Sequence, residues 1–128
     1  MADIEENVKV EITEEEKIKE RIINLTLNEQ GFQSYTTEKI NGYFKTLIIE
    51  KDDISPIRLI IKLAEHEVYL FNKSVEKITE VFLLKAQPQD YNGINWQFDV
   101  TEIPLNDSLY MELVGKAGQN VKITIRYE

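Results

Sequence analysis

The feature that most constrains this chain is an unbroken alternation of apolar and polar residues between Val121 and Glu128. Successive side chains of a β-strand point to opposite faces, so this period predicts a strand with one buried and one wet face. The predicted buried face consists of Val121, Ile123, Ile125 and Tyr127, and the predicted wet face of Lys122, Thr124, Arg126 and Glu128.

The segment Ser108–Val114 shows the same alternation, with its apolar side at Leu109, Met111 and Leu113. Between the two segments, Gly115–Asn120 contains two glycines, which readily adopt the positive φ angles of a tight reversal. The sequence therefore predicts an antiparallel hairpin that closes a β-sandwich at the C-terminus.

Most of the remaining chain also favours strands, because short β-branched and aromatic runs are bounded by turn residues. The predicted strands are Arg21–Leu27, Tyr43–Lys51, Ile57–Leu63, Val68–Phe71 and Ile94–Val100, while Lys77–Lys85 within residues 72–92 fits a strand or helical turns. Asn41–Gly42 is expected to form a two-residue hairpin turn, and Ile103–Asp107 a loop that crosses between sheets. The predicted fold is an all-β, antiparallel sandwich of jelly-roll-like type.

Residues 1–20 differ in composition from the rest, since they hold eight acids and only three lysines. We expect them to form an acidic N-terminal arm and residues 21–128 to form one sandwich domain. Thr13–Glu16 fits a capping box, so a short helix is expected from Glu14 to Glu20.

Charge and cysteine content exclude some partners and chemistries. A net charge of -8 repels a phosphate backbone, so nucleic acid is not an expected partner. The chain has no cysteine, which excludes disulfides and thiolate metal ligands. The first residues lack the pattern of a signal peptide, and no apolar run is long enough to span a bilayer, so synthesis in a cytoplasm without a membrane partner is expected.

Acidic and histidine residues offer weak metal or catalytic candidates. His66 lies between two glutamates, but neighbouring residues of a strand point apart and a catalytic zinc needs three converging ligands. Glu50, Asp52 and Asp53 lack the spacing of a calcium loop, and an exposed turn explains them better. As a carboxylate pair for glycoside hydrolysis they would have to face one cleft, which the sequence does not establish.

Phosphate-binding and nucleophile motifs are incomplete as well. Gly115–Gly118 lacks the full spacing of a phosphate loop and lies between strands instead of opening a helix. Ser55, Ser74 and Ser108 lack the context of a nucleophile elbow. The sequence therefore predicts no catalytic, metal-binding or cofactor-binding residue, and we do not expect an enzyme.

Aromatic residues are the remaining candidates for a binding surface. In a sandwich they serve either the core, a protein interface or a platform on which sugar rings stack. Trp96 and Phe98 are expected in the core, and Tyr91, beside Asn92 and Gly93, is expected outside. The aromatic candidates for a sugar platform or a protein interface are Tyr35, Tyr43, Phe44, Tyr69, Phe71, Tyr91, Trp96 and Tyr110.

Residues 41–128 resemble small β-sandwich structural proteins of tailed bacteriophages and prophages. The resemblance rests on Asn41–Tyr43 before an apolar strand, on the run Ile103–Leu109, on Gly115–Gly118 and on the final strand Val121–Glu128. It implies a virion component made in a bacterial host, either a head decoration or auxiliary capsid protein or a part of the neck, tail or baseplate. It implies other virion proteins as partners and no active site, with homo-oligomerisation as an open alternative.

Two functional hypotheses follow. The first is a phage virion structural protein that binds the major capsid protein or neighbouring subunits. The second is a carbohydrate-binding or adhesion sandwich that stacks sugar rings on exposed tyrosines.

Overall fold

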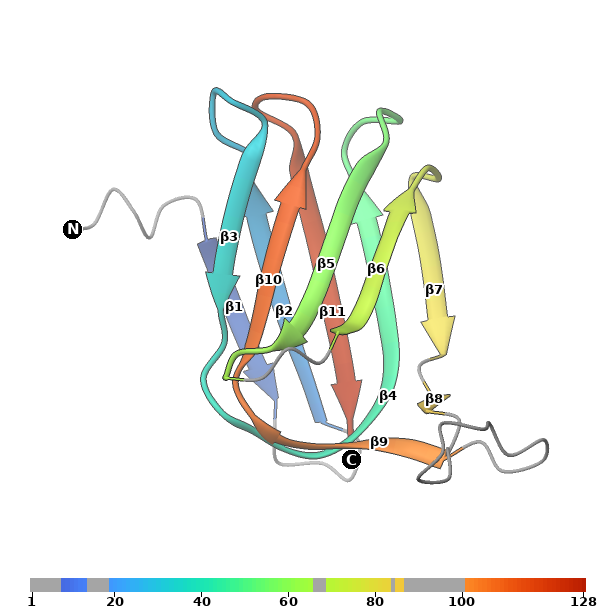
Figure 1. The fold of residues 1–128 in the computed structure, drawn as a ribbon. Coiled ribbons are helices and arrows are strands. Elements are labelled where there is room, and N and C mark those ends of the chain that lie inside the picture. Colours follow the sequence, from blue (N-terminus) through green and yellow to red (C-terminus); the bar gives the residue numbers. More distant parts are fainter. Residues whose placement is uncertain (1–7, 14–18, 66–68, 84, 87–100) are drawn as a thin grey trace, which may run out of the picture.

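The computed structural model describes residues 8–13, 19–65, 69–83, 85–86 and 101–128, which form a sandwich of two facing sheets (Figure 1). Its strands are β1 (Val8–Thr13), β2 (Lys19–Thr26), β3 (Phe32–Thr36), β4 (Ile40–Lys51), β5 (Ile57–Leu63), β6 (Tyr69–Val75), β7 (Thr79–Leu83), β8 (Lys85–Ala86), β9 (Thr101–Asp107), β10 (Leu109–Val114) and β11 (Asn120–Tyr127). The predicted all-β antiparallel sandwich is confirmed.

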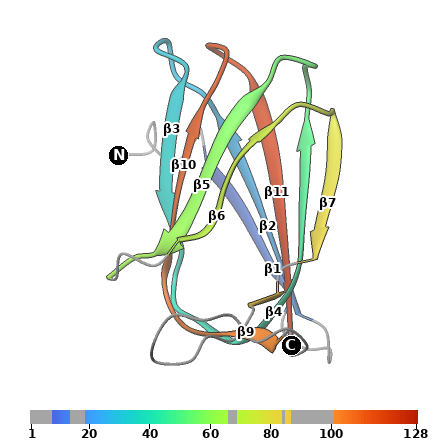
Figure 2. The ribbon, with the colours of Figure 1, turned by 45° about the vertical axis from the view of Figure 1, so that its right-hand side comes forward.

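The larger sheet has the order β1-β2-β11-β4, after which the two halves of the long strand β4 pair with different strands. Residues 40–44 pair with β9, residues 46–50 pair with β7, and β8 extends the sheet beyond β9. The smaller sheet has the order β3-β10-β5-β6, and all pairs in both sheets are antiparallel. Figure 2, turned by 45° from Figure 1, shows the small sheet facing the large one.

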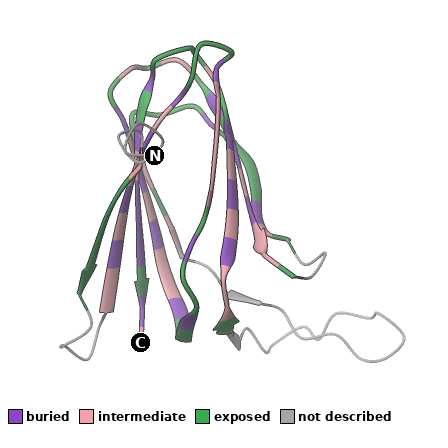
Figure 3. Ribbon diagram, turned by 90° about the vertical axis from the view of Figure 1, so that its left-hand side faces the viewer, coloured by how far each residue is buried: buried purple, intermediate pink, exposed green. Residues whose placement is uncertain are grey.

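The core lies between the sheets and follows from the two-residue period of the strands. Along the strands, buried positions alternate with more exposed ones, as the burial colours in Figure 3 show. The apolar faces predicted for 109–113 and 121–127 are buried. The fully buried apolar side chains from the large sheet include Ile23, Leu25, Leu47, Ile49, Ile123 and Ile125, and those from the small sheet include Leu59, Ile61, Leu109, Met111 and Leu113.

The predicted C-terminal hairpin is wrong, because β10 belongs to the small sheet and β11 to the large one. Both strands turn their apolar faces into the same core, but from opposite sheets, so the chain arches from one sheet to the other between them. Gly115 N donates to Gly31 O at 2.8 Å and Gly118 N donates to Leu27 O at 3.1 Å. The arch Gly115–Gln119 thus bonds to the β2–β3 connection instead of closing a ladder.

The predicted turn at Asn41–Gly42 is also wrong, since both residues lie inside β4. The chain crosses between the sheets just before them, and the guanidinium of Arg21 holds this crossing by donating to Glu38 O and Lys39 O. Gly42 has φ of 140°, and a Cβ there would lie 2.5 Å from Glu128 O. Glycine is therefore needed for the close approach of the C-terminal strand, not for a hairpin.

Ile103–Asp107 is part of the strand β9, where a crossing loop was predicted. It pairs with Ile40–Phe44 of β4, and the crossing between sheets follows at Ser108, between β9 and β10. The sequence between Lys77 and Lys85, for which strand and helix were both open, contains β7.

The N-terminal prediction needs correction as well. Val8–Thr13 was assigned to an arm, yet it forms β1 and pairs with β2 from Val8↔Leu25 to Thr13↔Glu20. Lys19 and Glu20, predicted to end a helix, begin β2 because they continue the ladder with β11. Residues 14–18, and the predicted strand 94–100 with its Trp96 and Phe98, lie outside the described residues.

Within the described residues, no helix has the length and apolar character that a membrane-spanning segment requires.

Candidate functional site: the outer face of the small sheet

The small sheet carries an ordered row of aromatic and charged side chains on the face that points away from the core. Because directly paired residues share a face, the registers of β3, β10, β5 and β6 align these outward residues in rows. One row across the sheet consists of Thr36, Tyr110, Lys62 and Tyr69. The next row consists of Ser34, Glu112, Ile60 and Asn72.

Five residues of these two rows, together with Ala64, line a shallow pocket of about 410 Å³. Lys62 Nζ lies 5.8 Å from the centroid of the Tyr110 ring, a cation–π distance. The Tyr110 hydroxyl donates to Glu112 Oε1 at 3.0 Å, and the neighbouring Tyr69 is 54% exposed. We call this pocket, lined by Ile60, Lys62, Ala64, Tyr69, Tyr110 and Glu112, the tyrosine pocket.

An irregularity in the sheet brings Tyr69 into this pocket. Ile61 pairs with Phe71, but the next residue of β5, Lys62, pairs with Tyr69, so that Leu70 is an extra residue in β6. Such a bulge re-aims the side chains beyond it. Leu70 packs against the core, whereas Tyr69 shares the outer face with Lys62.

The surroundings of Tyr110 in the tyrosine pocket raise its pKa above the ordinary value of a tyrosine. Partial burial raises the pKa of Tyr110, and the hydrogen bond to the Glu112 carboxylate and its negative charge raise the pKa further. A hydrogen bond with Ser34 and the charge of Lys62 act in the opposite direction. At neutral pH the pocket therefore offers a phenol, an ammonium and a carboxylate, which together donate and accept hydrogen bonds beside an exposed ring.

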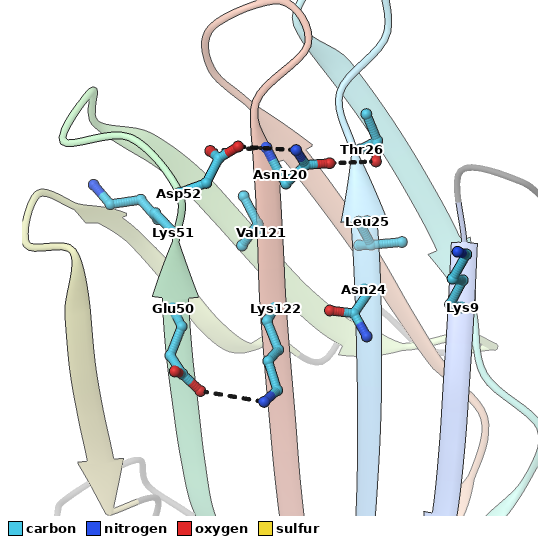
Figure 4. A pocket seen from close by; sticks show the side chains of 10 residues that line it. All are labelled: Lys9, Asn24, Leu25, Thr26, Glu50, Lys51, Asp52, Asn120, Val121 and Lys122. Atoms are coloured by element: carbon cyan, nitrogen blue, oxygen red, sulfur yellow. Dashed lines mark hydrogen bonds and ion pairs between the residues drawn. The ribbon is translucent and has the colours of Figure 1, made fainter.

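A second pocket, of about 450 Å³, lies on the large sheet across β1, β2, β11 and β4 (Figure 4). Its polar side chains mostly contact one another. Asn120 Nδ2 donates to Asp52 Oδ2 at 2.8 Å, and Thr26 Oγ1 donates to Asn120 Oδ1 at 2.6 Å. Lys122 forms an ion pair of 3.8 Å with Glu50. We call this the polar pocket; no aromatic residue lines it.

The acids that were metal or catalytic candidates in the sequence, Glu50, Asp52 and Asp53, each form hydrogen bonds or ion pairs with neighbouring residues. Asp53 Oδ1 accepts from the backbone N–H and the hydroxyl of Ser55, both at 2.8 Å, and Asp53 Oδ2 accepts from Lys116 Nζ at 3.0 Å. The backbone hydrogen bond, followed by the contact with Lys116, lowers the pKa of Asp53 to about 2. Glu50 and Asp52 are paired within the polar pocket, and the described residues contain no cluster of acids or histidine suited to a metal ion.

The remaining candidates are distributed over the molecule. Gly115–Gly118 lies in the arch to β11 and has no helix behind it. Ser55 is bonded to Asp53, Ser74 is exposed on β6, and Ser108 lies at the crossing between the sheets. His66 lies outside the described residues.

The aromatic candidates divide between core and surface. Phe44 and Phe71 are buried, Tyr35 packs partly against the core, and Tyr43 is 50% exposed on β4. Tyr91 and Trp96 lie outside the described residues. The sequence placed Tyr69 and Tyr110 among several aromatics but had no signal that joins them, because the bulge and the pairing of β10 with β5 are set by the tertiary fold.

No protein-family model matches the chain, and no curated protein matches it either. Among solved structures, a mutant of the family 29 carbohydrate-binding module CBM29-2 is similar with a TM-score of 0.39 and 11% identity, over 96% of this chain and 82% of that chain. The C-terminal family 6 carbohydrate-binding module of the laminarinase LamC from Zobellia galactanivorans gives a TM-score of 0.37 and 12% identity, over 95% and 89%. Scores this low do not bear on the function of this chain.

Proposed function

We propose that this protein is a carbohydrate-binding β-sandwich and that the tyrosine pocket on the small sheet holds the sugar. The observation that carries the proposal is the half-exposed ring of Tyr69 beside the Tyr110–Glu112 hydrogen bond. A pyranose has an apolar face and a rim of hydroxyls, so it binds where an aromatic ring lies next to hydrogen-bonding groups.

The shape of the site supports a sugar chain over a compact ligand. The tyrosine pocket lies on an open sheet surface, and the row of Ser34, Glu112 and Asn72 continues it across three strands. The hydroxyl, carboxylate and amide groups of that row already bond to Tyr110 and Arg58, and their remaining donors and acceptors match the repeated hydroxyls of a polysaccharide. The proposal requires no catalytic group, since binding alone is the activity.

The experiment that tests the proposal is a glycan array with the full chain, followed by calorimetric titration of any glycan that binds. We expect Tyr69→Ala to weaken binding at least about tenfold, which corresponds to about 1.4 kcal/mol for a lost stacking contact. Tyr69→Phe keeps the ring and should bind nearly as well as the natural chain.

Tyr43→Ala is the matched control, because Tyr43 is exposed to nearly the same extent but lies on the large sheet. Its binding should be unchanged. The proposal fails if no glycan binds, or if Tyr69→Ala and Tyr43→Ala have the same effect.

A second candidate function is that of a phage virion component, a head decoration protein in particular, that acts through contacts with other subunits. The observation that favours it is the end strand β1, where Val10 and Ile12 are 37% and 44% exposed. Apolar side chains at a sheet edge suit a protein partner. Mass spectrometry of purified particles, and binding of the full chain to empty capsids, would test this function; Tyr69→Ala should leave capsid binding intact.

A further inference from the structure

The end strand β1 has one side that no strand of the described residues uses. It pairs with β2 along its full length, from Val8↔Leu25 to Thr13↔Glu20, and lies at the end of the strand order of the large sheet. The backbone N–H and C=O groups on the other side of an end strand are available to a further strand.

The inner face of β1 is apolar and incompletely covered. Val8, Val10 and Ile12 share the side of the sheet that faces the core, yet Val10 and Ile12 are 37% and 44% exposed. Val10 and Ile12 line a cavity of about 130 Å³ at this open edge of the sandwich, and the rest of its lining is Arg21, Ile23, Tyr35, Thr37 and Glu38. The small sheet therefore covers these two side chains only in part, and a second apolar strand would cover them further.

The outer face of β1 carries one cation and one anion. Lys9 and Glu11 are both exposed, and neither forms an ion pair within the part of the chain that the structure describes. They are two residues apart and lie on either side of Val10. This spacing is self-complementary for an antiparallel partner of the same sequence.

We propose that β1 pairs antiparallel with β1 of a second copy of this chain, around a twofold axis at Val10. In this register Val10 faces Val10 of the second copy, and Lys9 faces Glu11 of the second copy. The same ion pair then forms twice, as the symmetry of an isologous dimer requires. On the inner face, Val8 of each copy meets Ile12 of the other, which buries the apolar side chains that are exposed in the single chain.

Other registers of the pair of β1 strands are less stable. A shift by one residue would turn the apolar face of one copy towards the outer face of the other. A shift by two residues places either Lys9 opposite Lys9 or Glu11 opposite Glu11, and directly opposed like charges destabilise a strand pair. Only the register centred on Val10 satisfies both the apolar and the charged face. This inference does not depend on the proposed carbohydrate binding.

Analytical ultracentrifugation of the full chain tests the proposal, from about 1 μM to about 1 mM protein. We expect a monomer–dimer equilibrium. Lys9→Glu and Glu11→Lys each oppose like charges twice, and each should raise the dimer dissociation constant at least about tenfold. The double variant Lys9→Glu/Glu11→Lys restores opposite charges and should dimerise like the natural chain.

A mixture of the two single variants gives the sharpest result. One copy then carries two acids at these positions and the other two lysines, so a mixed dimer should form where neither variant dimerises alone. Circular dichroism verifies that each variant is folded. The proposal is overturned if the natural chain stays monomeric over the whole range, or if its dimer is insensitive to all of these substitutions.

Discussion

The outer faces of the two sheets arise from the same strand alternation and both carry paired polar groups, but their pockets differ in aromatic side chains. On the large sheet, polar side chains are joined across strands. Arg126 Nε donates to Glu20 Oε2 at 2.9 Å. Lys122 pairs with Glu50, and Asn120 bonds to Asp52, as Figure 4 shows. On the small sheet, the tyrosine pocket combines a half-exposed ring with an ammonium and a carboxylate.

The difference teaches which face is suited to a ligand. On either sheet a sugar hydroxyl has to replace hydrogen bonds that the side chains already make, such as Asn120–Asp52 on the large sheet and Tyr110–Glu112 on the small one, so polar contacts alone gain little free energy. On the small sheet, stacking on Tyr69 adds apolar burial that water does not provide. The volume of a pocket is therefore a poor guide, because the polar pocket is slightly the larger of the two.

The largest effect on stability is expected at Lys51, which lines the polar pocket and whose side chain is buried. Its ammonium stabilises the fold through hydrogen bonds to backbone carbonyls. Lys51 Nζ donates to Val75 O at 2.9 Å and to Ser55 O at 3.0 Å, and so ties two connections between the sheets together. Lys51→Met leaves these carbonyls without their donor and should lower the free energy of unfolding by about 2 kcal/mol in urea titrations.

Lys122→Met is the matched control for Lys51, since it is a lysine of the same pocket with a partly exposed side chain. It should change the free energy of unfolding by less than about 1 kcal/mol. Equal destabilisation by the two substitutions would contradict the role assigned to Lys51.

The next largest effect is a dependence of the free energy of unfolding on pH, which is caused by the protonation of Asp53. Its pKa of about 2 is lower than that of an unfolded aspartate, so protonation favours the unfolded chain. The stability that the charged Asp53 contributes is present above about pH 4 and is lost as the pH falls towards 2. In Asp53→Asn this part of the acid dependence should be missing, as measured by thermal unfolding over that range; an unchanged pH profile would refute the assignment.

A smaller effect is expected on the titration of Tyr110. Burial and the Glu112 carboxylate raise the pKa of Tyr110, so Glu112→Gln should shift its titration to lower pH. Ultraviolet absorbance of the phenolate, compared with that of Tyr110→Phe to identify the signal, measures the shift. No shift would mean that the hydrogen bond between the two side chains is absent in solution.

The smallest effect is expected for the exposed ion pair between Lys122 and Glu50. Lys122→Ala should lower the free energy of unfolding by about 0.2–1 kcal/mol and leave glycan affinity unchanged. A clear loss of glycan affinity would move the binding site to the large sheet and reverse the comparison.

The sequence predicted the strands with a clear two-residue alternation, such as β5, β10 and β11, and their buried faces, because both follow from local alternation. It did not predict the strands at Val8–Thr13 and Ile103–Asp107, which are defined by their pairing with β2 and β4. It did not predict the partner of a strand. The apolar faces of β10 and β11 are compatible both with a hairpin and with two strands that face each other across the core, and the arch at Gly115–Gln119 has the same glycines as a hairpin turn.

Gly42 illustrates the same limit. An Asn-Gly pair is the strongest local signal for a hairpin turn. At Gly42, however, glycine is required because a Cβ would collide with the backbone of Glu128, which lies far away in the sequence. Tyr69 reaches the outer face through a bulge that depends on the pairing with β5. The candidate site was therefore predicted only as a class of residue, exposed tyrosine, and not as a place on the molecule.

The most direct test of the central claim is a heteronuclear NMR titration of the full chain with a glycan that binds on the array. The account predicts that the amide shifts cluster on the small sheet, at Lys62, Tyr69, Tyr110 and Glu112, while those of Asn24, Asn120 and Lys122 stay in place. Shifts that cluster around Asn120 and Lys122 would contradict the claim that the tyrosine pocket, and not the polar pocket, is the binding face.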